Sequence, residues 1–255
     1  MEVSNLNLER IESKYLVPAE LIPALCEFIK PYCELDPFCQ QEADNFYRIN
    51  SLYLDTYDQL FLRRKRMDLA KRFNMRVRSY GNEPKPPYFL EVKYKADGIV
   101  RKMRTPLECE NLEHEIFPSV GRKMSQNHEI FTKLAIQHDV RPTVMTSYRR
   151  MAFVSKVDRY ARVTFDIDLR YYPCNSFTMR PIIERERNYD NQLVFFENGN
   201  IVLELKTHTR VPAWMEDLIK YFNLTRTGFS KYASSMFHLE NDQEFRLLKE
   251  KVIHF

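Results

Sequence analysis

Apolar and polar residues alternate with a period of two along most of this chain, which is the pattern of β-strands that have one apolar face. The alternating stretches predict strands at residues 6–17, 45–55, 71–80, 88–95, 99–105, 143–153, 161–171, 180–187 and 200–207. The dipeptide Asp97-Gly98 predicts a hairpin turn between two of these strands. The chain is therefore expected to be dominated by an antiparallel sheet.

Helical spacing of apolar residues appears between some strands and near the end of the chain. It predicts helices at residues 18–28, 127–138, 212–222, 230–238 and 242–252, with Asn127 as a helix cap. A helix-like stretch at residues 57–62 runs into the basic run of residues 63–66, which we expect to be a solvated helix end because cations favour helix C-termini. Seven to nine strands with C-terminal helices predict a single α+β domain over residues 1–255.

The polar faces of the predicted strands are charged. In the strand at residues 71–80, one face carries Arg72, Asn74, Arg76 and Arg78. In the strand at residues 161–171, one face carries Arg162, Thr164, Asp166, Asp168 and Arg170. The unit E-x-K, in which a glutamate and a lysine share a face, occurs three times, at Glu12/Lys14, Glu91/Lys93 and Glu204/Lys206.

Two interpretations of these charged faces are open. A polar face in contact with water is the usual cause of alternation in antiparallel sheets. However, the faces are rich in arginine, and the amphipathic helices must bury their apolar stripes against some surface. If the helices cover the apolar sheet faces from outside, the sheet can curl shut with its charged faces inside. We therefore expect a barrel with a charged interior.

A charged interior requires a partner, because unpaired buried charges are unfavourable. Lysine and arginine outnumber the carboxylates on these faces, which predicts a polyanionic ligand. Arginine binds phosphate oxygens with a two-pronged geometry, and lysine acts as a point charge. The few carboxylates suit a hard divalent cation, Mg²⁺ or Mn²⁺, that would bridge phosphate oxygens.

Composition narrows the alternatives. Only five glycines occur, and no Gly-rich nucleotide-binding string is present. The net charge of +4 and a pI of about 8.7 argue against a nucleic-acid-binding module, although interleaved Tyr and Arg keep that alternative open. Five cysteines without a C-x-x-C pair predict neither disulfides nor a zinc site, and none of the six histidines forms a convincing site; His114 and His128 are expected at the surface.

The N-terminal sequence has no apolar signal core, and no stretch approaches the roughly 18 apolar residues of a membrane span. We therefore expect a cytoplasmic protein with no membrane segment of its own, a prediction that is compatible with a membrane-bound partner. The oligomeric state is left open.

The order of short motifs along the chain resembles the VTC-type polyphosphate polymerase domains of the triphosphate tunnel metalloenzyme superfamily, which are also called CYTH-like. Each motif is short, and their order and spacing carry the resemblance over nearly the whole chain. The motifs are R-x-E-x-K-Y from Arg10, S-x-Y-x-D-T from Ser51, R-x-R from Arg76, E-x-K from Glu91, Y-x-R from Tyr148, R-x-T-x-D from Arg162, L-E-L-K from Leu203 and S-K-Y from Ser230.

The resemblance implies a closed eight-stranded antiparallel tunnel with helices packed outside and at the C-terminus. It implies that ATP enters one end and that its γ-phosphate is transferred to phosphate or to a growing polyphosphate. The alternatives are an inorganic tri- or polyphosphatase of the same fold and a non-catalytic polyanion-binding module.

The resemblance also assigns roles to matching residues. The catalytic group would be Arg76, Arg78, Lys93, Arg150 and Arg162. Further phosphate contacts would come from Arg10, Lys14, Lys102, Tyr148, Lys206, Ser230 and Lys231, although the alternation leaves the facing of Lys102 and Arg104 ambiguous. Mn²⁺ or Mg²⁺ would be held by Glu204, Glu12 and Glu91.

One position departs from the related hydrolases. Many of them begin with E-x-E-x-K, in which both glutamates help to bind metal, whereas this chain has Arg10 at the first position. A cation in place of a carboxylate favours phosphate binding over a second metal, and it therefore favours the polymerase over the hydrolase.

Overall fold

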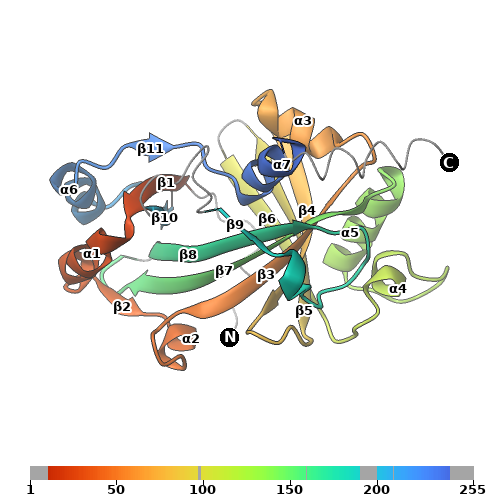
Figure 1. The fold of residues 1–255 in the computed structure, drawn as a ribbon, viewed down its shortest axis with the longest axis horizontal. Helices are drawn as coiled ribbons and strands as arrows, with labels where there is room; N and C mark the ends of the chain where they lie inside the picture. The colour runs from red at the N-terminus through yellow and green to blue at the C-terminus, as the bar shows by residue number, and fades with distance from the viewer. Residues whose placement is uncertain (1–10, 97–98, 159, 190–199, 209, 242–255) are drawn as a thin grey trace.

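The computed structural model describes residues 11–96, 99–158, 160–189, 200–208 and 210–241 (Figure 1). Within these ranges the strands are β1 (Ile11–Pro18), β2 (Cys33–Leu35), β3 (Tyr47–Asp55), β4 (Lys71–Tyr80), β5 (Tyr88–Ala96), β6 (Ile99–Leu107), β7 (Arg141–Ser155), β8 (Ala161–Pro173), β9 (Arg187–Asn188), β10 (Asn200–Thr207) and β11 (Arg226–Thr227). The α-helices are α1 (Ile22–Ile29), α2 (Pro37–Gln40), α3 (Leu60–Arg66), α4 (Leu112–Ile116), α5 (Gln126–Gln137), α6 (Ala213–Tyr221) and α7 (Lys231–Asn241), and 3₁₀ turns lie at Ala19–Leu21 and Ile183–Arg185.

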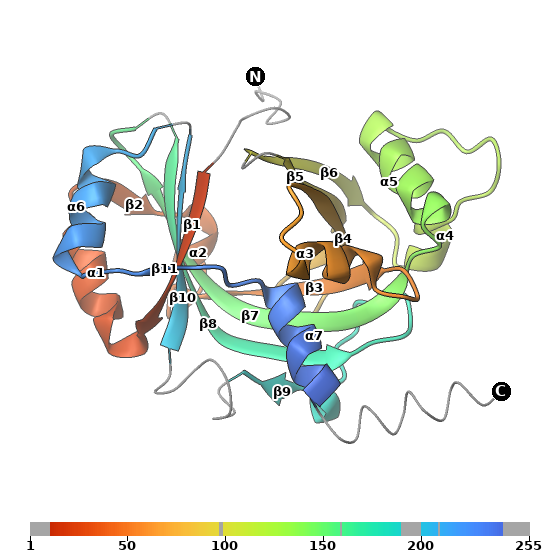
Figure 2. The ribbon, with the colours of Figure 1, turned by 90° about the horizontal axis from the view of Figure 1, so that it is seen from above.

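All of these strands belong to one antiparallel sheet. Its order is β11-β1-β10-β8-β7-β3-β4-β5-β6, with β2 beside β7 and β9 beside β8. The sheet bends into a trough: Figure 2 shows β1 and β10 on one side, β4, β5 and β6 on the other, and the long β7 and β8 running between them. The α+β class with a large antiparallel sheet is confirmed.

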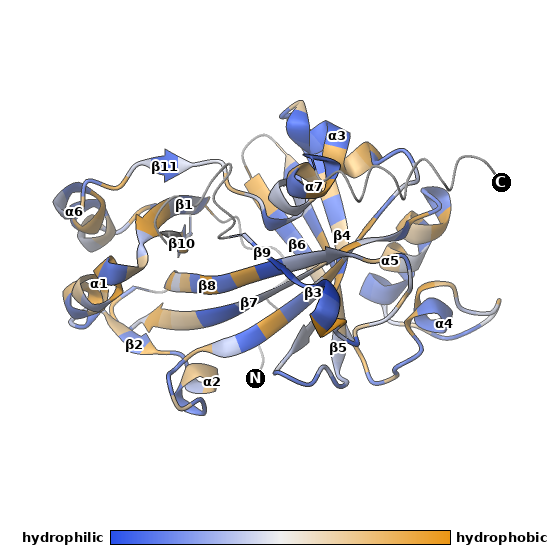
Figure 3. Ribbon diagram, viewed as in Figure 1, coloured by the Kyte–Doolittle hydropathy of each residue, from blue (hydrophilic) through white to orange (hydrophobic). Residues whose placement is uncertain are grey.

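The apolar faces of the strands point outward, where helices cover them. On the β1 side, Val163 and Leu203 pack with Leu25 of α1 and Leu218 of α6. On the other side, apolar residues of β4 and β5 pack against α4 and α5. Figure 3 shows the alternation of hydrophobic and hydrophilic positions along β3, β4 and β8 that makes this arrangement necessary. The opposite, polar faces therefore line the inside of the trough.

The expected closed barrel is not confirmed, because the sheet formed by the described residues is not closed by hydrogen bonds. Part of the outer edge of β1 is taken by β11, where Thr227 pairs with Lys14 and Arg226 with Tyr15. Between β1 and the β5–β6 hairpin, the described chain has instead a side-chain bridge from Lys93 to Glu12. The trough thus has a seam that side chains cross.

The strand predictions hold for most of the sheet, with one clear error. The strand expected at residues 180–187 is wrong: a 3₁₀ turn follows Pro181, and only Arg187 and Asn188 pair with β8. Proline lacks the N–H that a sheet ladder needs, so it interrupts the strand. Residues 6–10 of the first expected strand, the Asp97-Gly98 turn and the helix expected at residues 242–252 lie outside the described residues.

Local detail in the helices also differs from expectation. The cap of α5 is Ser125, whose hydroxyl accepts a hydrogen bond from the backbone N–H of His128 at 3.3 Å, and Asn127 lies inside the helix. His128 itself is buried, with its ring Nε2 2.7 Å from the carbonyl oxygen of Glu115, so its expected surface position is wrong. A backbone acceptor satisfies the ring nitrogen and allows the burial.

A β-bulge changes which residues of β8 face the trough. The register of β7 and β8 shifts between Ser147 and Arg149, and Asp168 has a positive φ of 48°. One extra residue reverses the alternation beyond it. Asp168 and Arg170 were expected on the same face as Asp166; this is wrong, because they pair with each other outside the cavity at 2.7 Å.

Asp55, at the end of β3, joins three elements. Its buried carboxylate accepts hydrogen bonds from the backbone N–H groups of Phe61 and Leu62 at the start of α3, both at 2.9 Å. It also accepts one from the hydroxyl of Tyr232 on α7 at 2.6 Å. The ring of Tyr232 stacks on Tyr53, with the ring centroids 4.9 Å apart. Asp55 therefore fixes α3 and α7 relative to the sheet.

We predict that Asp55→Ala lowers the free energy of unfolding by about 2–4 kcal/mol, because three buried donors lose their acceptor. Urea denaturation measures the loss. Asp217→Ala, on the exposed face of α6, is the control and should change stability by less than about 0.5 kcal/mol. Equal losses in the two variants would contradict the role of Asp55.

Candidate functional site

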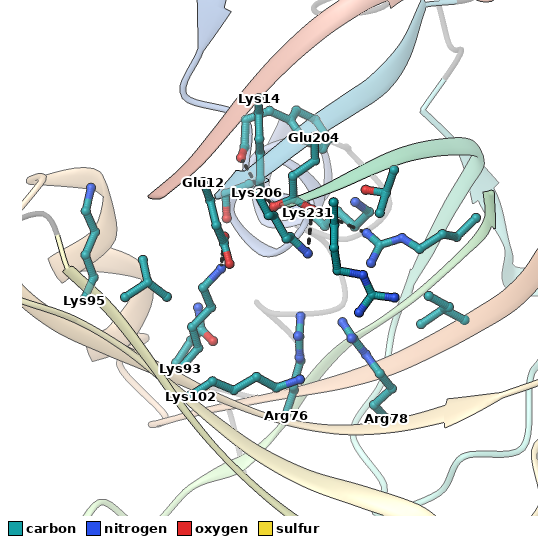
Figure 4. Close-up of a pocket in the computed structure, with 18 of the residues that line it drawn as sticks. Glu12, Lys14, Arg76, Arg78, Lys93, Lys95, Lys102, Glu204, Lys206 and Lys231 are labelled. Carbon is teal, nitrogen blue, oxygen red and sulfur yellow. Dashed lines mark hydrogen bonds and ion pairs between the residues drawn. The ribbon is translucent and has the colours of Figure 1, made fainter. Parts of the chain in front are cut away.

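The inner face of the trough encloses a cavity of about 700 Å³. The described residues that line it include fifteen lysines and arginines but only two carboxylates, Glu12 and Glu204. The net charge of the whole chain is +4, so positive charge is concentrated in the cavity and the remainder of the protein is net negative. Figure 4 shows these side chains converging from facing walls.

The structure brings together most of the residues that the sequence singled out. Thirteen of them line this one cavity: Glu12, Lys14, Arg76, Arg78, Lys93, Lys102, Tyr148, Arg150, Arg162, Glu204, Lys206, Ser230 and Lys231. Arg10 lies outside the described residues, and Glu91 is buried within the wall. Their roles stay predictions, but their convergence on a shared interior is observed.

Glu91 organises the wall formed by β4, β5 and β6. Its carboxylate lies 2.7 Å from Arg76, 2.5 Å from Lys102, 3.5 Å from Arg104 and 3.8 Å from Arg78. Burial alone would raise the pKa of Glu91, but the positive charges of Arg78 and Arg76 outweigh it and hold the pKa well below its ordinary value. The strand register also resolves the facing of Lys102 and Arg104, which point into the cavity beside Glu91.

Glu204 on β10 is the buried carboxylate that pairs with the cations of the facing wall. It lies 3.2 Å from Lys206, 3.5 Å from Arg150 and 3.9 Å from Lys14. Burial would raise the pKa of Glu204, but Lys206, Lys14 and Arg150 together lower it well below the ordinary value. Burial also lowers the pKa of Lys14 and of Lys206, although Glu204 opposes both shifts.

Asp166 on β8 holds a third pair of cations. Arg150 donates to both of its oxygens, from Nε at 2.6 Å and from Nη2 at 2.8 Å, and Lys231 of α7 approaches to 2.5 Å. Burial would raise the pKa of Asp166, but Arg150 and Lys231 lower it to about 2. Asp166 was placed on the charged face by the sequence but was not named as a site residue. Its position in the R-x-T-x-D motif was the available signal.

Lys93 and Glu12 connect the two walls across the seam (Figure 4). Burial would lower the pKa of Lys93, but Glu12 and Glu204 raise it above the ordinary value. Burial and the negative charge of Glu204 would both raise the pKa of Glu12, which means that the two carboxylates repel each other. The positive charge of Lys93 outweighs these effects, so the pKa of Glu12 lies below its ordinary value. A divalent cation between them would relieve this repulsion.

The carboxylates on the cavity lining provide few ligands for a metal ion. Among the described residues, no group of three or more His, Cys, Asp or Glu could hold a metal ion. Glu12 and Glu204 offer a pair of carboxylates, and Mg²⁺ and Mn²⁺ are commonly bound by one or two carboxylates together with substrate phosphates and water. Glu91, which is surrounded by four cations, does not join this pair.

Three polar atoms of described residues on the cavity lining have no protein partner. Within the described chain, Oδ1 of Asn74, Nε of Arg162 and the hydroxyl of Thr164 are buried without a hydrogen bond. Arg162 also donates to Asp36, the cap of α2, at 2.5 Å. Asp36 was missed because nothing in the sequence brings it next to β8. Buried polar atoms without partners usually bind water or a ligand.

Other residues line the cavity as well. Arg72 and Lys95 lie on strand faces that the alternation predicted to be charged and inward, whereas Lys65, Arg101 and Arg226 were missed. The expectation that the basic run at residues 63–66 is only a solvated helix end is wrong for Lys65. Lys95 continues the face of Glu91 and Lys93, as the period-two alternation predicts.

We predict that the charge of Asp166 contributes stability that acid removes. Because its pKa in the folded protein lies below the ordinary value near 3.9, the contribution is complete above that value and is lost as pH falls towards 2. Between about pH 5 and pH 1.5, the free energy of unfolding of Asp166→Asn should therefore fall by about 2 kcal/mol less than that of the wild type, as measured by urea unfolding. Asp217→Asn is the control. An unchanged slope for Asp166→Asn would contradict the assignment.

The bent antiparallel sheet surrounds a cationic interior, and the sequence comparisons identify the family. The chain matches the family model of the VTC domain over residues 9–239. It therefore belongs to the VTC domain family, which confirms the resemblance seen in its motifs. This membership supports a role in triphosphate or polyphosphate metabolism.

Two solved structures illustrate how widely the fold is shared. A candidate adenylate cyclase from Bacillus halodurans is 13% identical, with 88% of this chain and 94% of that one covered and a TM-score of 0.50. A candidate adenylyl cyclase from Hippeastrum, HpAC1, described as having a dominant triphosphatase activity, is 15% identical, with coverages of 91% and 96% and a TM-score of 0.50. At these identities the likeness shows the fold alone.

A search of curated proteins gave no match. In the described ranges, no helix has the length and apolar character needed to cross a bilayer.

Proposed function

We propose that this protein is a metal-dependent polyphosphate polymerase that transfers the γ-phosphate of ATP to a phosphate or polyphosphate acceptor inside the basic cavity. The observation that carries the proposal is the enclosure of cations from facing walls around a single space. Such a concentration of like charge is unfavourable when no anion is present. A linear phosphate chain supplies the compensating charge along the whole cavity.

The cations have the chemistry that phosphoryl transfer requires. Arg76 and Arg78 on one wall and Arg150 on the other present guanidinium groups that can each bind two phosphate oxygens. Lys93 and Lys14 add point charges from the seam and from β1. Phosphoryl transfer depends mainly on positioning and charge neutralisation, and this arrangement supplies both without a covalent protein intermediate.

In the proposed step, an oxygen of the acceptor phosphate forms a bond to the γ-phosphorus of ATP. The bond between that phosphorus and the β–γ bridging oxygen breaks, and its electron pair leaves with ADP. The acceptor oxygen is already an anion at neutral pH, so no side chain has to remove a proton from it. Arg76, Arg78, Arg150, Arg162 and Lys93 would neutralise the charge on the transferring group.

Glu204 and Glu12 would hold Mn²⁺ or Mg²⁺, which would supply further neutralisation of phosphate charge. Lys102, Lys206, Tyr148, Ser230 and Lys231 would contact the remaining phosphates. Arg10 is proposed as a further phosphate ligand on sequence alone. Glu91 is better explained as the counterion that holds its four cations in place than as a metal ligand.

Transfer to phosphate is favoured over hydrolysis by the weak basicity of the available carboxylates. Water needs a base to become a nucleophile, and a base is effective when its pKa lies near the working pH. Glu204 and Glu12 both have pKa values below the ordinary value, so they are poor bases. A phosphate acceptor avoids this requirement. We place the reaction in a reducing, cytoplasmic compartment, with which the five free cysteines agree.

We predict that the protein incubated with ATP and Mn²⁺ produces polyphosphate, seen as a ladder on a urea gel. Free phosphate release is measured in parallel by a colorimetric assay. Free phosphate without polymer would instead support the tri- or polyphosphatase. Binding of polyphosphate with neither product would support a non-catalytic polyanion-binding module.

We predict that Arg76→Ala and Lys93→Ala each lower kcat/KM by at least about 100-fold, because each removes a charge from the proposed transition state. Circular dichroism checks that both variants fold. Arg141→Ala, which alters an exposed arginine paired with Asp139 outside the cavity, is the matched control and should keep wild-type turnover. Wild-type turnover in either cavity variant would contradict the site.

The protonation of Lys102 should make the affinity for a phosphate ligand depend on pH. Burial holds the pKa of Lys102 well below its ordinary value, and Arg78 and Arg76 lower it further against the opposing charge of Glu91. A bound phosphate chain adds negative charge and must raise this pKa. Binding should therefore take up protons, and the affinity should fall as pH rises through the pKa of Lys102 in the free protein.

Calorimetry of triphosphate binding in two buffers of different ionisation enthalpy measures this uptake. It is done at one alkaline pH, so that the ligand's own protonation is the same for every protein compared. Lys102→Met should take up fewer protons than the wild type. Lys85→Met, which changes an exposed lysine paired with Glu83, should not differ from it. Equal uptake in all three proteins would exclude Lys102 as the source.

A further inference from the structure

The inner face of the trough changes from cationic to aromatic at one end. On β4, Arg76 and Arg78 are followed on the same face by Tyr80. Tyr47 begins the neighbouring strand β3, and Phe89 lies near the start of β5. Both Tyr47 and Tyr80 line the cavity. We call Tyr47, Tyr80 and Phe89 the aromatic end of the cavity.

The fold brings these three rings together from three strands. The ring centroids of Tyr47 and Tyr80 are 6.1 Å apart, and those of Tyr80 and Phe89 are 5.7 Å apart. Arg104 of β6 holds two of the rings: its guanidinium carbon lies 3.6 Å from the centroid of Phe89, and its Nη2 donates to the hydroxyl of Tyr80 at 3.1 Å. The rings are therefore positioned before a ligand binds, which lowers the cost of binding.

The aromatic end suits a flat apolar group better than a phosphate. Tyr47 and Tyr80 pack against a buried apolar cluster and also line the cavity, where both are partly exposed. The face of an aromatic ring carries partial negative charge, so it does not attract phosphate oxygens. The nearby cation, Arg104, already contacts Glu91 at 3.5 Å as well as Tyr80 and Phe89. A planar ring stacked here would remove apolar surface from water.

The position of the aromatic end matches the length of a nucleotide. Tyr80 lies four residues beyond Arg76 on β4, which is about 13 Å at roughly 3.3 Å per residue. Figure 4 shows Arg78 on the side of Arg76 that is away from Lys93. If the γ-phosphate lies at Arg76, the other two phosphates run past Arg78 and the base reaches Tyr80.

We propose that the aromatic end is a subsite for the base of a free nucleoside triphosphate, which stacks on Tyr80 while its phosphates contact Arg78 and Arg76. This inference rests on the proposed function and adds two points to it: the end of the cavity that holds the nucleoside, and the residues that distinguish ATP from an inorganic phosphate chain. Because stacking requires only a flat ring, purines should bind more tightly than pyrimidines.

The test measures equilibrium binding of ATP and of inorganic triphosphate to the 255-residue protein in EDTA, which prevents metal-dependent turnover. In Tyr80→Leu, the Kd for ATP should rise about tenfold, because one base–aromatic stack is lost. The Kd for inorganic triphosphate should stay within about twofold of wild type. The preference of the wild type for ATP over UTP should also become smaller in Tyr80→Leu.

Two matched variants isolate the contribution of the ring. Tyr80→Phe keeps the ring and removes the hydroxyl that accepts a hydrogen bond from Arg104, so its Kd for ATP should stay within about threefold of wild type. Tyr57→Leu changes an exposed tyrosine outside the cavity and should alter neither Kd.

The outcomes separate this inference from the proposed function. If Tyr80→Leu weakens ATP and inorganic triphosphate equally, or if Tyr80→Phe loses as much ATP affinity as Tyr80→Leu, the base subsite is wrong and the proposed function stands. If the wild type binds neither ligand, the proposed function fails. If an RNA with a 5′-triphosphate binds more tightly than ATP and is weakened to the same extent in Tyr80→Leu, the assignment to a free nucleotide is overturned.

Discussion

The structure depends on three buried carboxylates that hold together an interior of like charge. Glu91, Glu204 and Asp166 each contact two or more cations, and in each case the attraction of those cations outweighs the burial that would otherwise raise the pKa of the carboxyl group. Removing one partner from such a group leaves a buried charge without compensation, which costs several kcal/mol. The carboxylates therefore position the arginines and lysines before any ligand arrives.

The alternation along the strands produces this charged interior even though the overall composition of the sequence is ordinary. A period of two sends apolar residues outward to α1, α6, α4 and α5 and charged residues inward. Most of the hydrophobic stabilisation thus lies outside the trough, where it is independent of the ligand. Asp55 then fixes α7 through Tyr232, so that the neighbouring Lys231 reaches Asp166. The site thus occupies the inner faces of the strands, where Tyr53 and Tyr148 belong both to a buried apolar cluster and to the cavity lining.

Much of this could be predicted from sequence, because alternation specifies both the strands and the face of each residue. The E-x-K units and the Arg76/Arg78 pair therefore pointed to the interior correctly. Features set by distant contacts could not be predicted in this way. The bulge at Asp168 reverses a face, and Asp36 meets Arg162 only after folding. The missing closure of the sheet depends on how β1, β11 and β6 meet, which no local pattern encodes.

The seam between β1 and the β5–β6 hairpin has a mechanical consequence. In a fully hydrogen-bonded barrel, strand number and stagger fix the diameter. Here, within the described chain, the Lys93–Glu12 bridge spans the gap where a backbone ladder would otherwise run. At this seam the spacing of the two walls is therefore set by a side-chain contact and not by a strand ladder. A contact between two side chains imposes no fixed stagger on the strands it joins, so the width of the trough is less strictly determined here than within the sheet.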